Sequence, residues 1–272
     1  MFVKIDGTVT ALAPLYQGGN EKTGSTPVLR SITIWTSKGE KNIPYLHGNS
    51  IRGRLRRPLV KDFLARIGYQ IKGKSLYHSL FSGGVLENSD NTNQGVIDLE
   101  LKNKIKEFIP PISLLGACFG NQMIQGCLSV GHMFPICEEY SEYLPDHLKK
   151  DERSKQPVRV FTDEEFITRR DELRERDENE QAIQMKVDYE CFIPGTRFYH
   201  SFVLSYPTEI DKACFARAIE LWEKHPTVGG RSSSGDGIVK LDYNIPFDSK
   251  AYLEFLDENK EEIIRLLEEL DR

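Results

Sequence analysis

The sequence is poor in cysteine and has no apolar run at its start. Lys4 and Asp6 follow Met1 closely, where a secretory signal peptide would have an uncharged apolar stretch. The 5 cysteines among 272 residues are an odd number, in a chain without the signature of an exported protein. We therefore expect reduced, mostly buried thiols and a cytoplasmic protein.

A membrane-spanning segment is also missing from the pattern. The longest stretch without Asp, Glu, Lys or Arg runs from Phe108 to Cys137, but prolines, side-chain amides and glycines interrupt it. The composition, with 39% hydrophobic and 28% charged residues, is that of a globular protein. We expect a single domain over residues 1–272 with a substantial core and no membrane partner.

The charge is unevenly distributed along the chain. The formal net charge is −5, yet residues 51–74 contain 8 basic residues and one acid, Asp62. The acids gather elsewhere, with 15 acids against 9 bases in residues 138–182 and 9 against 4 in residues 248–272. Because a local patch decides anion binding, the basic segment predicts a polyanionic partner despite the acidic total.

The order of predicted elements indicates the fold class. Alternation of apolar and polar residues predicts a strand over residues 2–12, and further strands are expected over 186–206 and 238–243. A helix is expected over 208–225 and an acidic helix over 248–272. Together with the basic helix described next, this order predicts an α+β fold of RRM-like or ferredoxin-like type.

The basic segment itself has the pattern of a helix. Apolar residues spaced by four run from Ile51 to Ile67, after an Asn49-Ser50 pair that resembles an N-cap. Gly68 is a suitable end, and Pro58 predicts either a kink or a later start of the helix. Forked arginine donors beside a helix N-terminus suit phosphate groups, although a solvated basic face would give the same pattern. The candidate RNA-binding residues here are Asn49, Ser50, Arg52, Arg54, Arg56, Arg57 and Lys61.

A second candidate is the glycine- and serine-rich loop from Thr227 to Gly237. Its backbone N–H groups are free to bind phosphate or ribose, although a plain connection between two elements is the alternative. The candidate residues in this loop are Gly229, Gly230, Arg231, Ser232 and Ser233.

Three other motifs are weaker. Residues 68–75 match the nucleotide-binding pattern G-x-x-x-x-G-K-[ST], but a helical segment precedes them where that motif requires a strand. Cys118, Cys127, His132 and Cys137 lack the close cysteine pairs of zinc sites, so we expect no metal and no other cofactor. His47, beside the basic segment, is a candidate general base for RNA cleavage, although a lone histidine is more often structural.

Three segments resemble motifs of the RAMP superfamily of CRISPR-associated proteins. Residues 43–56 are similar to the family's I-P-G-S-S-x-K-G-x-x-R element, residues 191–198 to its P-x-G-t-x-F strand entry, and residues 229–237 to its C-terminal glycine-rich loop. The layout most resembles the backbone subunit, the seventh Cas family, in its type IV or type I-D versions. Arg169 and Arg170, within residues 168–173, contribute to that likeness.

The resemblance implies an RRM-like palm with two insertions, a lid at residues 82–111 and a thumb at 138–185. It implies a non-catalytic subunit that stacks head to tail along CRISPR RNA and presents the guide to target DNA or RNA. Its partners would be copies of itself and other Cas subunits. By this resemblance, Ser50, Arg52 and Arg56 would hold guide phosphates, and Arg169 and Arg170 would belong to the RNA-binding set.

One departure from the family bears on catalysis. RNA-cutting type III relatives carry an aspartate in a D-x-P-V setting, where this chain has Ser25-Thr26-Pro27-Val28. The resemblance therefore implies that this subunit does not cleave target RNA. The alternative within the same superfamily is an endoribonuclease that matures CRISPR RNA, with His47 as its general base.

Overall fold

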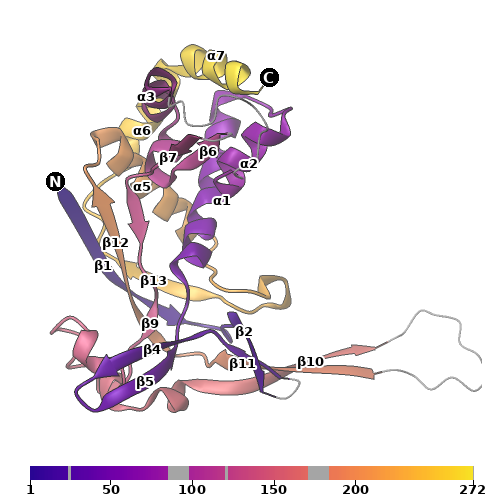
Figure 1. Cartoon of the computed structure of the whole chain (residues 1–272), viewed down its shortest axis with the longest axis vertical. Coiled ribbons are helices and arrows are strands. Elements are labelled where there is room, and N and C mark those ends of the chain that lie inside the picture. Colours follow the sequence, from indigo (N-terminus) through magenta and orange to yellow (C-terminus); the bar gives the residue numbers. More distant parts are fainter. Residues whose placement is uncertain (24–25, 85–97, 120–121, 171–183, 272) are drawn as a thin grey trace, which may run out of the picture.

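A computed structural model describes residues 1–23, 26–84, 98–119, 122–170 and 184–271. For residues 20–23, 169–170 and 184–185 it describes the backbone alone. Figure 1 shows an elongated molecule with helices gathered at one end and a long hairpin, β10–β11, leaving the body near the other.

An antiparallel sheet forms the centre of the molecule. Its strands have the order β13-β1-β12-β8, and the short strand β9 also pairs with β12. Residues in β12 alternate between buried and half-buried, which is the period of two expected of a sheet with one face on the core. The strands are β1 (Phe2–Ala11), β8 (Leu128–Val130), β9 (Phe134–Pro135), β12 (Arg197–Ser205) and β13 (Val239–Tyr243).

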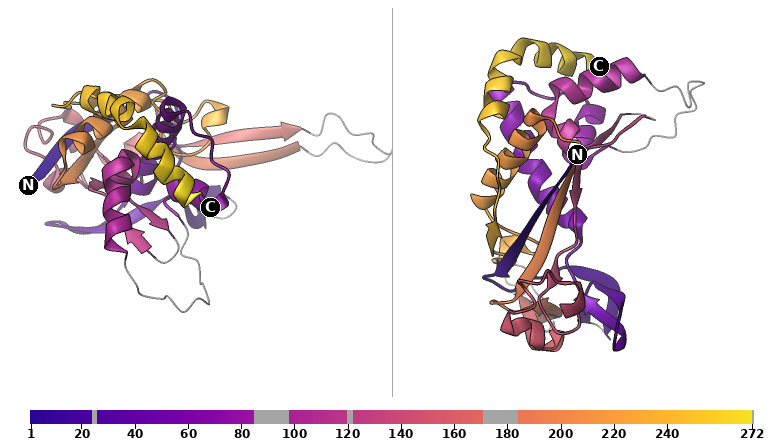
Figure 2. Two further views of the ribbon diagram at one scale, coloured as in Figure 1. Left: turned by 90° about the horizontal axis from the view of Figure 1, so that it is seen from above. Right: turned by 90° about the vertical axis from the view of Figure 1, so that its left-hand side faces the viewer.

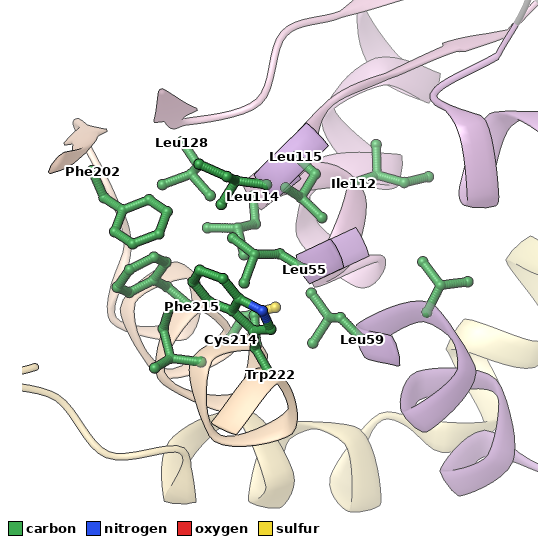
Figure 3. Packing of buried hydrophobic residues seen from close by; sticks show 14 of the residues in the cluster. Leu55, Leu59, Ile112, Leu114, Leu115, Leu128, Phe202, Cys214, Phe215 and Trp222 are labelled. Carbon is green, nitrogen blue, oxygen red and sulfur yellow. The ribbon is translucent and has the colours of Figure 1, made fainter. Parts of the chain in front are cut away.

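Two helices cover the core face of this sheet. The spacing of apolar residues predicted both, and α1 (Gly48–Ile67) and α5 (Glu209–Glu223) pack against each other. Figure 3 shows Leu55 and Leu59 of α1 facing Phe215 and Trp222 of α5, with Phe202 of β12 beside them. The helix α5 begins at Thr208 with a reciprocal capping box to Asp211, as predicted for this end.

The remaining helices extend this core at one end of the molecule. The acidic segment predicted as one helix forms two, α6 (Lys250–Glu258) and α7 (Lys260–Leu270), which lie near α3 in both views (Figures 1 and 2). The predicted lid at residues 82–111 overlaps the next two helices. Residues 99–115 form α3 (Leu99–Phe108) and α4 (Pro110–Leu115), whose buried apolar residues join the main core, and residues 85–97 lie outside the described ranges.

Residues 68–75, which match the nucleotide-binding pattern, make a structural contact with Asp271 after α7. Gly68, at φ +73°, ends α1, and the loop after it leads into α2 (Lys74–Ser82). The backbone N–H groups of Lys72 and Gly73 donate to the carboxylate of Asp271, at 2.8 and 2.7 Å. The expectation that a helix precedes the pattern is confirmed, and this loop holds the end of α7 against α2.

The predicted thumb at residues 138–185 divides into two parts. Residues 138–161 form three short 3₁₀ turns at Ser141–Tyr143, Glu152–Lys155 and Val158–Phe161, and small apolar clusters hold them against neighbouring elements. Only β10 (Thr162–Arg170) and β11 (Gln184–Phe192) form a projecting arm, which leaves the body in both Figure 1 and Figure 2. The projecting hairpin thus spans the second part of the predicted thumb and continues to Phe192.

Three short hairpins complete the described chain. They pair β2 with β3, β4 with β5, and β6 with β7. Their strands are β2 (Gly18–Thr23), β3 (Thr26–Leu29), β4 (Ser31–Thr36), β5 (Gly39–Pro44), β6 (Ala117–Phe119) and β7 (Gln122–Ile124).

Candidate nucleic-acid interface

The basic helix α1 begins two residues earlier than predicted. Its N-cap is His47, whose Nδ1 accepts a hydrogen bond from the Asn49 N–H at 3.1 Å. The Nδ1 atom of His132 accepts from the Gly48 N–H, also at 3.1 Å. Two imidazoles therefore satisfy N–H groups that a helix otherwise leaves unpaired at its start. The helix continues across Pro58 to Ile67.

Three hollows surround the first turns of α1. We call them the α5-side, α4-side and α2-side hollows, with volumes of about 510, 860 and 430 Å³, and together the basic groove. Asn49 lines all three, and Gly53 and Arg57 line both the α5-side and the α2-side hollow. Asn49, Gly53 and Arg57 are spaced by four, so they form one ridge along the helix between hollows.

Arg54 and Arg57 present their charges to the groove. Arg57 is exposed and makes no hydrogen bond or ion pair with any residue in the described ranges. Arg54 is half-buried, and its Nη2 donates to the carbonyl oxygen of Gly229 at 2.8 Å. Burial and the nearby charge of Arg57 lower the pKa of Arg54, so two cations lie close together here. Lys61, one turn beyond Arg57, is exposed too.

Arg52 and Arg56 line the α4-side and α2-side hollows, and both donate hydrogen bonds to backbone carbonyls of the protein itself. Arg56 is 7% exposed, and its guanidinium donates to the carbonyl oxygens of Leu80, Leu115 and Gly116 at 3.2, 2.8 and 2.9 Å. Burial lowers its pKa to about 10. Arg52 is half-buried and donates to the carbonyls of Leu115 and Leu128. We correct the assignment of Arg56 as a phosphate ligand, because its donors serve the C-terminal ends of α2 and α4.

The one acid of the basic segment is neutralised away from the groove. The two carboxylate oxygens of Asp62 accept from Nε and Nη2 of Arg217 on α5, at 3.0 and 2.6 Å. None of the residues that line the three hollows is an aspartate or a glutamate. The groove is therefore a cationic surface on a chain whose net charge is −5.

The glycine-rich loop meets α1 at this groove, where the two candidate segments lie side by side. Gly229 has φ +76°, and a Cβ there would come within 2.4 Å of the Tyr16 carbonyl oxygen. The guanidinium of Arg231 stacks on two tyrosine rings, with its Cζ 3.6 Å from the ring centre of Tyr189 and 4.8 Å from that of Tyr16. Its Nη1 atom is buried and has no hydrogen-bond partner among the described residues, so its assignment to RNA binding stays a prediction. Ser232 and Ser233 are exposed in a short 3₁₀ turn (Ser232–Ser234), and Ser232 lines the α5-side hollow.

The remaining candidate RNA-binding residues differ in how much of them the structure describes. Arg169 and Arg170 are the last residues of β10, at the outer end of the hairpin, and their side chains lie outside what the structure describes. Ser50 and Asn49 line the groove, and their binding to RNA stays a prediction. No pattern in the sequence pointed to Leu221 and His225, which line the α5-side hollow at and just beyond the end of α5. Nothing in the sequence places this helix end beside α1.

The imidazole of His47 is arranged as a cap. Because Nδ1 accepts from the helix N–H, the proton of the neutral ring lies on Nε2. Burial lowers the pKa of His47, as do the charges of His132 and Arg30. Within the described ranges, the five cysteines are buried, and no group of three His, Cys, Asp or Glu side chains is placed to hold a metal ion.

In the part of the chain that the structure describes, no helix is both long and apolar enough to cross a lipid bilayer.

The comparisons with known proteins show a similarity at the level of the fold. The sequence matches no protein-family model and no curated protein. A chain of a solved structure titled "Type IV-B CRISPR Complex" shares the fold, with a TM-score of 0.62 and 20% sequence identity. The match covers 90% of this chain and 91% of that chain. The resemblance to type IV CRISPR-associated subunits that the sequence motifs predicted is thus confirmed for the fold.

Proposed function

We propose that this chain is a subunit of a CRISPR effector complex that holds the sugar–phosphate backbone of CRISPR RNA in the basic groove. The observation that carries this proposal is the composition of the groove. Its polar lining consists of basic side chains, amides and hydroxyls without a single carboxylate, on a chain that is acidic overall. Such a surface binds a polyanion by neutralising phosphates and releasing their counterions.

The arrangement of the sheet supports a palm of ferredoxin-like type. In chain order the central elements are β1, α1, β8, β12, α5 and β13, and in the sheet the strands have the order β13-β1-β12-β8. This is the split β-α-β alternation, β-α-β-β-α-β, in which two helices cover one face of an antiparallel sheet. The structural similarity to a chain of a type IV-B CRISPR complex supports the same assignment.

The partners that we propose follow from the small number of cations in one groove and from the opposite charge of another surface of the protein. One protomer offers only a few exposed cations in its groove, so stacking of several copies along one RNA multiplies a modest affinity. The contact between such copies is head to tail, and the acidic helices α6 and α7 offer a surface opposite in charge to the groove. Other Cas subunits, and target DNA or RNA paired to the guide, complete the proposed complex.

We further propose that this subunit does not itself cleave RNA. A general base needs a lone pair free to accept the 2′-hydroxyl proton. In His47 the Nδ1 lone pair already accepts from Asn49, and the lowered pKa reflects a neutral, partly buried ring. These contacts explain His47 as the cap of α1 and leave the ribonuclease alternative without a supporting observation.

Gly53 provides a test that separates RNA binding from folding. A Cβ at this position would meet no atom of the described residues within 4 Å, so the protein's own packing does not require glycine there. Glycine inside a helix costs about 0.5–1 kcal/mol relative to alanine. We expect Gly53→Ala to raise the free energy of unfolding by about that amount and to weaken binding of single-stranded RNA, because the new methyl group lies where the RNA backbone approaches.

The matched control is Ala65→Gly, an exposed position on the same helix that lines none of the hollows. It should lower stability by a similar amount and leave RNA affinity unchanged. Urea unfolding and filter binding measure the two quantities. If Gly53→Ala is stabilised and binds RNA as tightly as the wild type, the RNA does not cross α1 at Gly53.

A further inference from the structure

The lining of the α5-side hollow combines two chemistries. It includes the cations Arg54 and Arg57 of α1. It also includes apolar or flat side chains, namely Pro58 of the same helix and Leu221, Trp222 and His225 from the region of α5. By contrast, the α2-side hollow on the far side of the Gly53 ridge is lined almost wholly by polar residues, with Phe81 as the exception. Binding of phosphate alone does not require apolar lining residues.

We infer that the α5-side hollow binds one unstacked nucleobase of single-stranded RNA, with the base on the imidazole of His225 and its phosphate at Arg57. This inference rests on the proposed function and names a subsite within the same groove. Its volume of about 510 Å³ lies within the range of small-molecule pockets. Histidine is among the side chains on which unpaired RNA bases stack.

Two hydrogen bonds within the protein hold the lining residues of this subsite in place. The indole Nε1 of Trp222 donates to the Thr227 carbonyl oxygen at 3.1 Å, which fixes the apolar floor. The bond from Arg54 to the Gly229 carbonyl oxygen fixes the glycine-rich loop relative to α1. The hollow is thus formed before any ligand enters, which lowers the ordering cost of binding.

Polar side chains that line the hollow can form hydrogen bonds with the edge of the base. Those of Asn49, Ser50 and Ser232 line the hollow and make no hydrogen bond to any described residue, so their donors and acceptors are open to a ligand. Asn49 and Arg57 also line the α2-side hollow. The RNA backbone can therefore pass over Gly53 from one hollow to the next while a single base turns toward His225.

The test compares a single-stranded RNA with the same RNA made abasic at every position, by filter binding at fixed salt. For wild type we expect the abasic RNA to bind about fivefold to tenfold more weakly, which is the loss of one stacked base. His225→Ala should show this loss on ordinary RNA and no further loss on abasic RNA. His225→Phe should restore the affinity for ordinary RNA. His147→Ala, an exposed histidine away from the groove, is the matched control and should behave as wild type.

Two results overturn the subsite, and a third overturns the proposed function. If His225→Ala binds ordinary RNA as wild type does, or is weakened equally on both RNAs, no base occupies the hollow. Arg57→Ala is measured alongside, because it should weaken both RNAs. If neither RNA depends on Arg57, the groove does not bind the RNA backbone, and the proposed function fails together with the subsite.

Discussion

Arg57→Glu is expected to lower the affinity for single-stranded RNA at least about tenfold near 0.1 M salt. Arg57 is exposed on the ridge between two hollows and has no partner among the described residues, so its charge is available to a phosphate. The glutamate removes one phosphate contact and adds repulsion at the same place. Fluorescence anisotropy with a labelled RNA of guide length measures the change.

The matched control for this variant is Arg66→Glu, which alters the net charge by the same amount on the same helix. Nine residues separate the two arginines, at about 100° each, so they project from opposite sides of α1. Arg66 lines none of the hollows, and its Nε lies 3.8 Å from the Asp62 carboxylate. Equal losses in the two variants would show that only the overall charge matters and that the groove has no special part in binding.

Arg56→Leu is expected to destabilise the protein by about 3 kcal/mol, a far larger effect than any change at an exposed arginine. The carbonyl oxygens of Leu80 and Gly116 would lose the donors described above, while that of Leu115 keeps Arg52. Each buried acceptor left without a donor costs about 1–3 kcal/mol. Urea unfolding followed by circular dichroism gives the difference in free energy.

Arg57→Leu is the comparison for this second prediction. The same substitution one position along the helix, at an exposed site, should change stability by no more than about 0.5 kcal/mol. An Arg56→Leu protein as stable as the wild type would mean that the three carbonyl contacts do not join α1 to α2 and α4. It would also return Arg56 to the set of candidate RNA ligands.

The sequence predicted α1 well because its apolar residues repeat at the helical spacing. It could not tell Arg56 from Arg57, since the difference depends on elements distant in the chain. The acceptors of Arg56 at Leu80 and Leu115 lie 24 and 59 residues further on, and only tertiary packing brings their carbonyls beside the guanidinium. A run of basic residues thus contained both buried structural cations and exposed ones.

The charged region after residue 137 shows a second limit. The family resemblance implied a thumb over residues 138–185, and within this region β10 and β11 form a projecting hairpin. Residues 138–161 nevertheless fold against the β4–β5 hairpin, because scattered apolar residues such as Phe161 meet Ile43 and Cys137 in a small cluster. Such a cluster has no period in the sequence, since its members come from separate segments.

The hollow beside α5 shows a third limit. Asn49 and Arg57 could be chosen from the basic segment, whereas His225 lies more than 160 residues further along the chain from Arg57. The sheet brings the end of α5 beside the start of α1, and the Arg54 contact with Gly229 places the loop between them. The topology, rather than any local motif, completes the candidate site.

The most direct test of the central claim is the salt dependence of RNA binding by the unmodified protein. If Arg54, Arg57 and Lys61 neutralise about three phosphates, the logarithm of the association constant should fall with the logarithm of salt concentration with a slope of about −2. A slope near zero, with binding that persists at high salt, would contradict the account, because it would mean that the cations of α1 do not contact the RNA backbone.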